Sequence, residues 1–253
     1  MARQKPSRRQ LLAGSVVAIA GSAGCLSATP TDEATTETGT PPERLTELSV
    51  ADFFQYLLSG THPTVHRKAG QQYVVVRLER GARNHMTLYL DGEAVDRASR
   101  EPVKEDDTVT AVFAVSKDRT VERGELRLGG STFRTLPPET ISRLNEPPVF
   151  EVGEPSVSPA EIEPEQRTEV TVTFTVTNHG EGTGTFGASL SGPASGSDLV
   201  RTTLDPGEER ELSPTTTRYG GEEQARVWLD WGVDRWSTEI PVTATETPST
   251  ASE

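Results

Sequence analysis

The feature that most constrains the fold is a strict alternation of apolar side chains with threonine, which reads VTVTFTVT over residues 170–177. Successive side chains of a strand point to opposite faces of a sheet, so this period predicts a strand with one buried face. The NHGEG sequence of residues 178–182 follows directly and is rich in turn-forming residues. The pattern predicts a strand that ends in a turn.

The same alternation recurs through the second half of the chain. A second strand is predicted from Phe186, Ala188 and Leu190, and Asp205-Pro206-Gly207 predicts a turn. Two later strands are predicted from Val227, Leu229 and Trp231 and from Trp236, Thr238 and Ile240. Short strands separated by turns over about 100 residues are typical of a β-sandwich.

Three segments of this half resemble the CARDB-type Ig-like domain: the SVSP sequence of residues 156–159, the VTVTFTVTN-H-G strand, and the LDPGE turn of residues 204–208. The resemblance covers roughly Phe150–Val242. It implies a surface β-sandwich used for adhesion, spacing or complex assembly, and it carries no catalytic residues to this sequence.

The first half is also rich in strand patterns. Residues 73–78 form an apolar run typical of a strand buried on both faces, and alternation is seen at 86–90 and 109–115. Asp91-Gly92 and Gly129-Gly130 predict hairpin turns. Residues 50–58 match both helical spacing and an extended strand, and we favour the strand. A short helical turn is predicted at 139–145, followed by a domain boundary at 145–148.

These patterns predict an all-β protein with two tandem β-sandwich modules. The expected boundaries are 46–145 for the N-terminal module, 146–242 for the CARDB-like module and 243–253 for a disordered tail. Residues 26–45 and the tail are rich in Thr, Glu and Pro and have almost no apolar side chains. They therefore lack the burial that would offset ordering entropy, so 25–45 is expected to be a disordered linker behind a lipidated residue.

The N-terminus predicts export and anchoring. Arg8 and Arg9 precede an apolar stretch over residues 11–20, which is too short to span a bilayer and resembles a Tat signal. Small residues then precede Cys25, the one cysteine of the chain, in an arrangement that resembles a lipobox with Ser22 in place of the usual Leu. We expect residues 1–24 to be removed and Cys25 to carry the lipid that holds the protein at the extracellular face of the cell membrane.

The charge balance is strongly acidic. The formal net charge is −13, and residues 1–24 hold four basic residues and no acid, so the remainder carries −17. Such a field opposes nucleic-acid binding. Only four lysines occur against 21 arginines, a composition that resembles proteins of extreme halophilic archaea. At 1 M salt the Debye length is about 3 Å, so self-repulsion nearly vanishes. We expect low salt to loosen or unfold the chain.

Several groups of side chains are candidate sites of chemistry. The i, i+4 spacing of His62 and His66 would direct both side chains at one metal ion only on a helix, and Pro63 disfavours a helix here. Both are therefore expected to be solvated loop histidines, and the same is expected of His179. The one further histidine, His85, is the remaining candidate for a third histidine ligand. A blue-copper site needs a cysteine thiolate as a ligand, and the one cysteine, Cys25, lies in the lipobox-like sequence, so this kind of site is excluded. The acidic segment 96–107 is a possible Ca²⁺ loop, but it lacks EF-hand spacing; its acids are Asp96, Glu101, Glu105, Asp106 and Asp107.

Three tryptophans lie close together near the C-terminus: Trp228, Trp231 and Trp236. On a regular strand Trp228 and Trp231 face opposite ways, so one of them is available for a protein or glycan interface, whereas the alternative is that all three fill the core. No catalytic motif occurs, and neither a cofactor nor a metal is expected.

The sequence thus favours a lipid-anchored, non-catalytic surface protein that binds or assembles with a surface protein or glycan in high salt. Two alternatives stay open: a metal-assisted hydrolase built on loops of the first module, and a solute-binding lipoprotein of a transporter. The second is disfavoured because helical periodicity is nearly absent.

Overall fold

The computed structural model describes residues 44–58, 62–79, 86–103, 108–192, 195–221 and 224–243. It confirms the all-β fold class. In chain order the elements are β1 Leu45–Ala51, β2 Phe54–Leu58, β3 His62–His66, β4 Gln71–Glu79, β5 Met86–Leu90, β6 Glu93–Val95, β7 Thr108–Ser116, β8 Gly124–Leu128, β9 Ser131–Thr135, α1 Pro138–Asn145, β10 Phe150–Val152, β11 Ser156–Ser158, β12 Arg167–Asn178, β13 Gly184–Gly192, β14 Ser195–Leu204, β15 Glu209–Leu212, β16 Thr215–Tyr219, β17 Gln224–Asp230 and β18 Arg235–Pro241.

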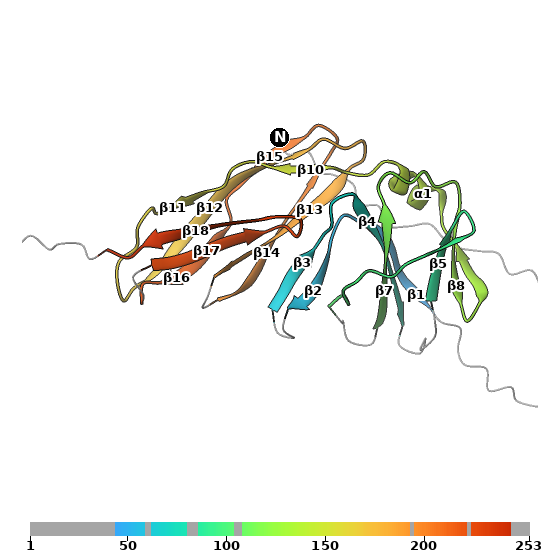
Figure 1. Ribbon diagram of the computed structural model, residues 1–253, viewed down its shortest axis with the longest axis horizontal. Helices are drawn as coiled ribbons and strands as arrows, with labels where there is room; N and C mark the ends of the chain where they lie inside the picture. Colours follow the sequence, from blue (N-terminus) through green and yellow to red (C-terminus); the bar gives the residue numbers. More distant parts are fainter. Residues whose placement is uncertain are drawn as a thin grey trace, which may run out of the picture. The chain divides into compact units, whose positions relative to one another are not determined.

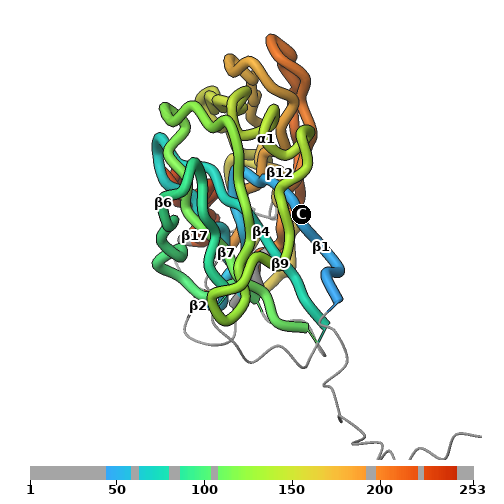
Figure 2. The backbone as a smooth tube through the Cα atoms, turned by 90° about the vertical axis from the view of Figure 1, so that its right-hand side faces the viewer, coloured from blue at the N-terminus to red at the C-terminus, as the bar shows by residue number. Residues whose placement is uncertain are grey.

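The N-terminal sandwich, made from residues 45–145, packs two antiparallel sheets face to face. One sheet has the order β1-β4-β7 and the other β6-β5-β8-β9; β1, β4 and β7 are labelled in Figure 2. Between them lies a core of buried side chains that includes Val74, Val76, Leu88, Phe113 and Leu126. The central strand β4 is buried on both faces, as its apolar run predicts.

Residues 50–51 and 54–58 lie in strands, which settles the helix-or-strand question in favour of strand. β1 pairs antiparallel with β4, with Val50 opposite Val74, and β2 pairs with β3 in a separate hairpin. Asp52 and Phe53 separate the two strands. The helical spacing of the apolar residues is overridden because each strand finds its own hydrogen-bonding partner.

The predicted hairpin turns are confirmed. Asp91 and Gly92 both have positive φ, 54° and 86°, between β5 and β6. Gly129 and Gly130 have φ of 57° and 91° between β8 and β9. This is the backbone geometry that two-residue hairpin loops require. The predicted helical turn is confirmed as α1, which buries Leu144 in the N-terminal core.

The C-terminal sandwich, made from residues 150–242, has β12 in one sheet, where it pairs with β10, β11, β15 and β16, and β14-β13-β17-β18 in the other (Figure 1). Along β12, Val170, Val172, Phe174 and Val176 are buried while the threonines between them are partly exposed. The alternation therefore did predict one buried face. These residues join those of β13 and β17 in a single core.

Asn178, at the end of β12, is fully buried and fully hydrogen-bonded. Its Oδ1 accepts from the backbone N–H of Val149 (3.1 Å) and of Gly180 (3.0 Å). Its Nδ2 donates to the carbonyl oxygens of Gly182 (2.9 Å) and Leu204 (3.1 Å). A buried amide with four partners fixes three backbone segments relative to one another.

Candidate functional site

A cluster of buried charges lies where the two sandwiches touch. We call this region the seam and define it by Asp52, Phe53, Arg67, Gln72 and Lys117 of the N-terminal sandwich with Pro148, Phe186, Gly187 and Trp231 beyond α1. The described residues all belong to one compact unit. In Figure 1 the β2–β3 hairpin lies beside β13 and β14, both of which contact β3.

Asp52 is at the centre of the seam and binds two cations. Its Oδ2 is 2.6 Å from Nε of Arg67, and its other oxygen, Oδ1, accepts a bond from Nζ of Lys117. The side chains of Asp52 and Arg67 are 1% and 6% exposed, and that of Lys117 is 14% exposed. Charges withdrawn from water to this extent are retained only when they are paired and hydrogen-bonded.

Both cations also reach across the seam to backbone oxygens. Lys117 Nζ donates to the carbonyl of Pro148 at 2.6 Å, and Arg67 Nη1 donates to the carbonyl of Trp231 at 2.9 Å. Two positive charges share a single carboxylate, so these carbonyl dipoles supply the remaining stabilisation. Arg67 thereby ties the N-terminal sandwich to the C-terminal one, and Lys117 ties it to the connection between them.

Arg67 is surrounded by aromatic rings. Its guanidinium lies 5.0 Å from the ring centroid of Phe186, 5.6 Å from that of Phe53 and 5.7 Å from that of Phe150. Such distances are within the range of cation–π attraction. Burial lowers the pKa of Arg67 from its ordinary value, and the Asp52 carboxylate opposes that shift. Arginine keeps its charge in proteins, so the site holds a permanent buried cation.

The two sandwiches approach closely enough to require glycine. A Cβ atom at Gly187 would lie 2.3 Å from the ring of Phe53, and one at Gly182 would lie 1.9 Å from the carbonyl oxygen of Glu146. Further contacts flank this approach: Thr64 Oγ1 lies 3.4 Å from Ser189 Oγ, and Arg201 donates to Gln55 at 3.0 Å. The connection after α1 is thus seated directly on the backbone of the C-terminal sandwich.

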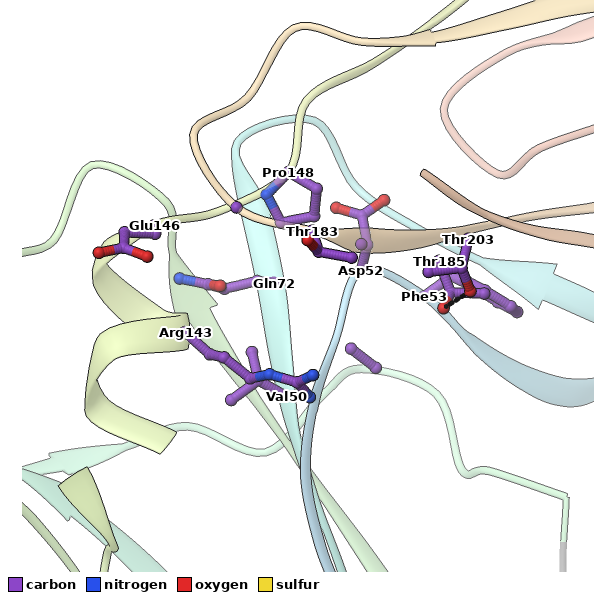
Figure 3. A pocket seen from close by; sticks show the side chains of 13 residues that line it. Val50, Asp52, Phe53, Gln72, Arg143, Glu146, Pro148, Thr183, Thr185 and Thr203 are labelled. Carbon is purple, nitrogen blue, oxygen red and sulfur yellow. Dashed lines mark hydrogen bonds between the residues drawn. The ribbon is translucent and has the colours of Figure 1, made fainter. Parts of the chain in front are cut away.

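A cavity of about 350 Å³, which we call the seam cavity, opens beside this cluster (Figure 3). Gln72, Arg143 and Glu146 lie on one side of it, and Thr185 and Thr203 lie on the other. The rest of the lining comes from both sandwiches: Val50, Ala51, Asp52, Phe53, Pro148, Gly182, Thr183 and Gly184. The cavity is therefore bounded by groups of either charge, by hydroxyls and by apolar surface.

His66 is not a solvated loop histidine, so that prediction was wrong. Residues 62–66 form β3, and the imidazole of His66 is half-buried among the rings of Phe54 (4.9 Å), Tyr73 (5.8 Å) and Tyr56 (5.9 Å). Burial lowers the pKa of His66, and the positive charges of Lys68 and Arg100 lower it further. Burial likewise raises the pKa of Tyr73 to about 12. Pairing with β2 holds Pro63 in an edge strand, where proline is tolerated.

The other polar candidates are not gathered by the fold. Among the described residues, no group of three or more His, Cys, Asp or Glu side chains is placed to hold a metal ion. Asp96 and Glu101 are exposed, whereas Glu105, Asp106, Asp107 and His85 lie outside the described residues. His179 is exposed beyond β12 and lies 2.8 Å from a carboxylate oxygen of Glu151.

The three tryptophans are all half-buried, so neither expectation for them holds in full. Trp231 and Trp236 pack against the C-terminal core, whereas Trp228 belongs to the opposite face of β17. The backbone carbonyl of Trp231 also accepts the bond from Arg67. Arg8, Arg9 and Cys25 lie outside the described residues, so export and lipidation stay predictions. The helix of the described part, α1, is not long and apolar enough to cross a membrane.

Sequence reasoning did not single out Asp52, Arg67, Gln72 or Lys117. One signal was available for Lys117: it is one of only four lysines in a chain that otherwise uses arginine. A compact ammonium suits a site between one carboxylate and one carbonyl, where a forked guanidinium does not fit as well. Neither a scan against protein-family models nor a search of curated proteins finds a match to this chain.

Proposed function

We propose that this chain is a non-catalytic binding or assembly module, held by a lipid on Cys25 at the extracellular face of the cell membrane and adapted to high salt. Its partner is a surface protein or a glycan. The motif resemblance to CARDB-type Ig-like domains supports this assignment, as do the twin arginine and the lipobox-like sequence. The domain division at 46–145 and 146–242 is part of the same proposal.

The observation that carries the proposal is the buried Asp52–Arg67–Lys117 cluster. A flexible pair of domains would place its binding groups anew at each encounter and lose entropy on binding. The cluster instead links the two sandwiches through charge-assisted bonds to Pro148 and Trp231. Groups from both halves, such as Gln72 and Thr203, are thereby held around one preformed cavity.

The anchoring half of the proposal is tested by expressing the full chain in a halophilic host. Mass spectrometry of the membrane fraction is expected to find a mature chain that begins at a lipid-modified Cys25. A Cys25→Ser variant is expected to escape into the medium. Full-length precursor in the cytosol with a free thiol would overturn the proposal.

The binding half is tested by cross-linking on intact cells at high salt. We compare the wild type with Asp52→Ala, which breaks the seam, and with the matched control Asp96→Ala at an exposed position. A cross-linked surface protein or glycan is expected with the wild type and the control and is expected to be lost with Asp52→Ala. Equal recovery with all three would show that the seam has no part in binding.

A further inference from the structure

Gln72 is a fully buried side chain with half of its amide unused. It lies on β4 with an exposed fraction of 0%, and its Nε2 donates to the carbonyl of Leu144 at 2.7 Å. Its Oε1 has no hydrogen-bond partner among the described residues, and the residue lines the seam cavity. A buried acceptor left unpaired costs free energy, which a bound group that donates a hydrogen bond recovers.

The groups around Gln72 define the chemistry of that donor. Glu146 adds a carboxylate on the same side of the cavity, and Arg143 adds a guanidinium (Figure 3). Across the cavity the hydroxyls of Thr185 and Thr203 lie 3.0 Å apart, so each pairs with the other and keeps further bonding capacity. A ligand with several hydroxyl groups, which both donate and accept, matches this lining.

The apolar part of the lining and the size of the cavity narrow the class of ligand that the cavity could bind. Val50, Phe53 and Pro148 offer apolar surface to the C–H groups of a ring. A volume of about 350 Å³ is at the lower end of small-molecule sites, which suits one six-carbon sugar rather than an oligosaccharide. The carboxylates of Asp52 and Glu146 disfavour an anionic ligand, and the buried cations beside them disfavour a cationic one.

We propose that the seam cavity binds a single neutral sugar unit of hexose size and that one of its hydroxyls donates to Oε1 of Gln72. This inference rests on the proposed function as a binding module and names the ligand class of the seam. The sugar is either free or the terminal unit of a surface glycan. Both sources present the same hydroxyls.

The test is a calorimetric titration of the full chain in 2 M KCl with D-glucose, D-galactose and D-mannose, each also as its methyl α-glycoside. We expect saturable binding of at least one hexose. Binding of the free sugar but not of its glycoside identifies the free form, and binding of both is expected for the end of a glycan. Glycine serves as a zwitterionic counter-probe, and binding of glycine with no binding of any sugar would overturn the inference.

Substitutions locate the binding site. Gln72→Met keeps the size of the side chain and removes the acceptor, and we expect it to weaken hexose binding about tenfold, the loss of one well-placed hydrogen bond. The matched control Gln166→Met, at an exposed position in the C-terminal half, is expected to leave the affinity unchanged. Equal affinity in Gln72→Met and the wild type would contradict the proposed contact.

A second variant covers the case in which Gln72→Met does not fold. Thr185→Val with Thr203→Val removes a pair of hydroxyls that bond each other, so no partner is left unpaired, and it is expected to weaken hexose binding while the melting temperature is retained. If no hexose binds but the surface cross-link of the wild type persists, the sugar assignment fails and the binding module stands. Hexose binding without any membrane-anchored form would refute the anchor alone.

Discussion

The two sandwiches differ in how they use charge. Residues 46–145 hold fourteen acidic and fourteen basic side chains, whereas residues 146–242 hold eighteen acidic and only six basic ones. The acidic excess is therefore concentrated in the C-terminal half. The balanced N-terminal half instead places three of its charges, Asp52, Arg67 and Lys117, in the buried seam.

The two halves also differ in whether a buried side-chain amide has all its hydrogen-bond partners. Asn178, in the C-terminal half, is neutral and has all its partners within the fold. Gln72, in the N-terminal half, has an acceptor without a partner among the described residues. One buried amide therefore completes its hydrogen bonds within the fold, whereas the other keeps an acceptor that the described residues do not use.

Removing salt is expected to give the largest effect. The Debye length grows from about 3 Å at 1 M to about 30 Å at 0.01 M, so repulsion among the acids of residues 146–242 returns. We expect circular dichroism to show loss of the native fold between these conditions. A melting temperature independent of KCl would contradict the comparison.

Charge-removing variants sharpen this test. Three substitutions at exposed positions of the C-terminal half, Glu154→Gln, Glu169→Gln and Glu211→Gln, are expected to reduce the salt dependence. The matched set in the balanced half, Glu101→Gln, Glu122→Gln and Glu139→Gln, is expected to reduce it less.

Asp52→Ala is expected to give the next largest effect. It leaves Arg67 and Lys117 buried without their carboxylate, which typically costs about 4 kcal/mol of unfolding free energy. Denaturant unfolding in 2 M KCl measures the loss. Asp96→Ala, at an exposed position, is expected to change stability by no more than about 0.5 kcal/mol. A similar small change for Asp52→Ala would show that the seam charges do not hold the halves together.

Asn178→Ala is expected to cost about 3 kcal/mol, because it orphans backbone groups of Val149, Gly180, Gly182 and Leu204. Asn145→Ala is the control: Asn145 makes two bonds to the backbone of Val121 from an exposed position, and we expect a loss of about 1 kcal/mol. Equal losses of unfolding free energy in the two variants would mean that the burial of Asn178 does not strengthen its contribution to stability. Hexose binding is expected to survive in Asn178→Ala wherever the fold persists.

The pH dependence from His66 is expected to be the smallest effect. Its pKa is lower in the folded chain than the ordinary 6.5, so below pH 6.5 the unfolded chain binds more protons. The contribution of His66 to stability is complete above pH 6.5 and is lost as pH falls through its folded pKa. His66→Gln is expected to flatten this slope, with His179→Gln, at an exposed position after β12, as the control. Parallel curves of stability against pH for the wild type and both variants would show that His66 is not the source of the pH dependence.

Much of the fold could be predicted because apolar alternation and turn residues record it directly. The strand at 170–177 and the hairpins at 91–92 and 129–130 are examples. β16 could not be predicted in this way, since the side chains that it buries are Thr216 and Arg218. Alternation measures hydrophobicity, so a strand whose inward face is polar leaves no such signal.

The seam could not be predicted for a different reason. Asp52, Arg67 and Lys117 each come directly after a strand, and only the pairing of distant strands brings them together. Gln72 stands beside Gln71 just before the apolar run of residues 73–78, a position that suggests nothing about its partners. Which charges are buried is decided by tertiary contacts that a single sequence does not state.

The central claim is that the seam makes the two sandwiches one cooperative unit, and two-probe unfolding tests it most directly. The three tryptophans all lie in the C-terminal half, so their fluorescence follows that half, and hydrogen exchange of β4 and β7 follows the other. In 2 M KCl the two transitions are expected to coincide for the wild type and to separate in Asp52→Ala. Transitions that are already separate in the wild type would contradict the account.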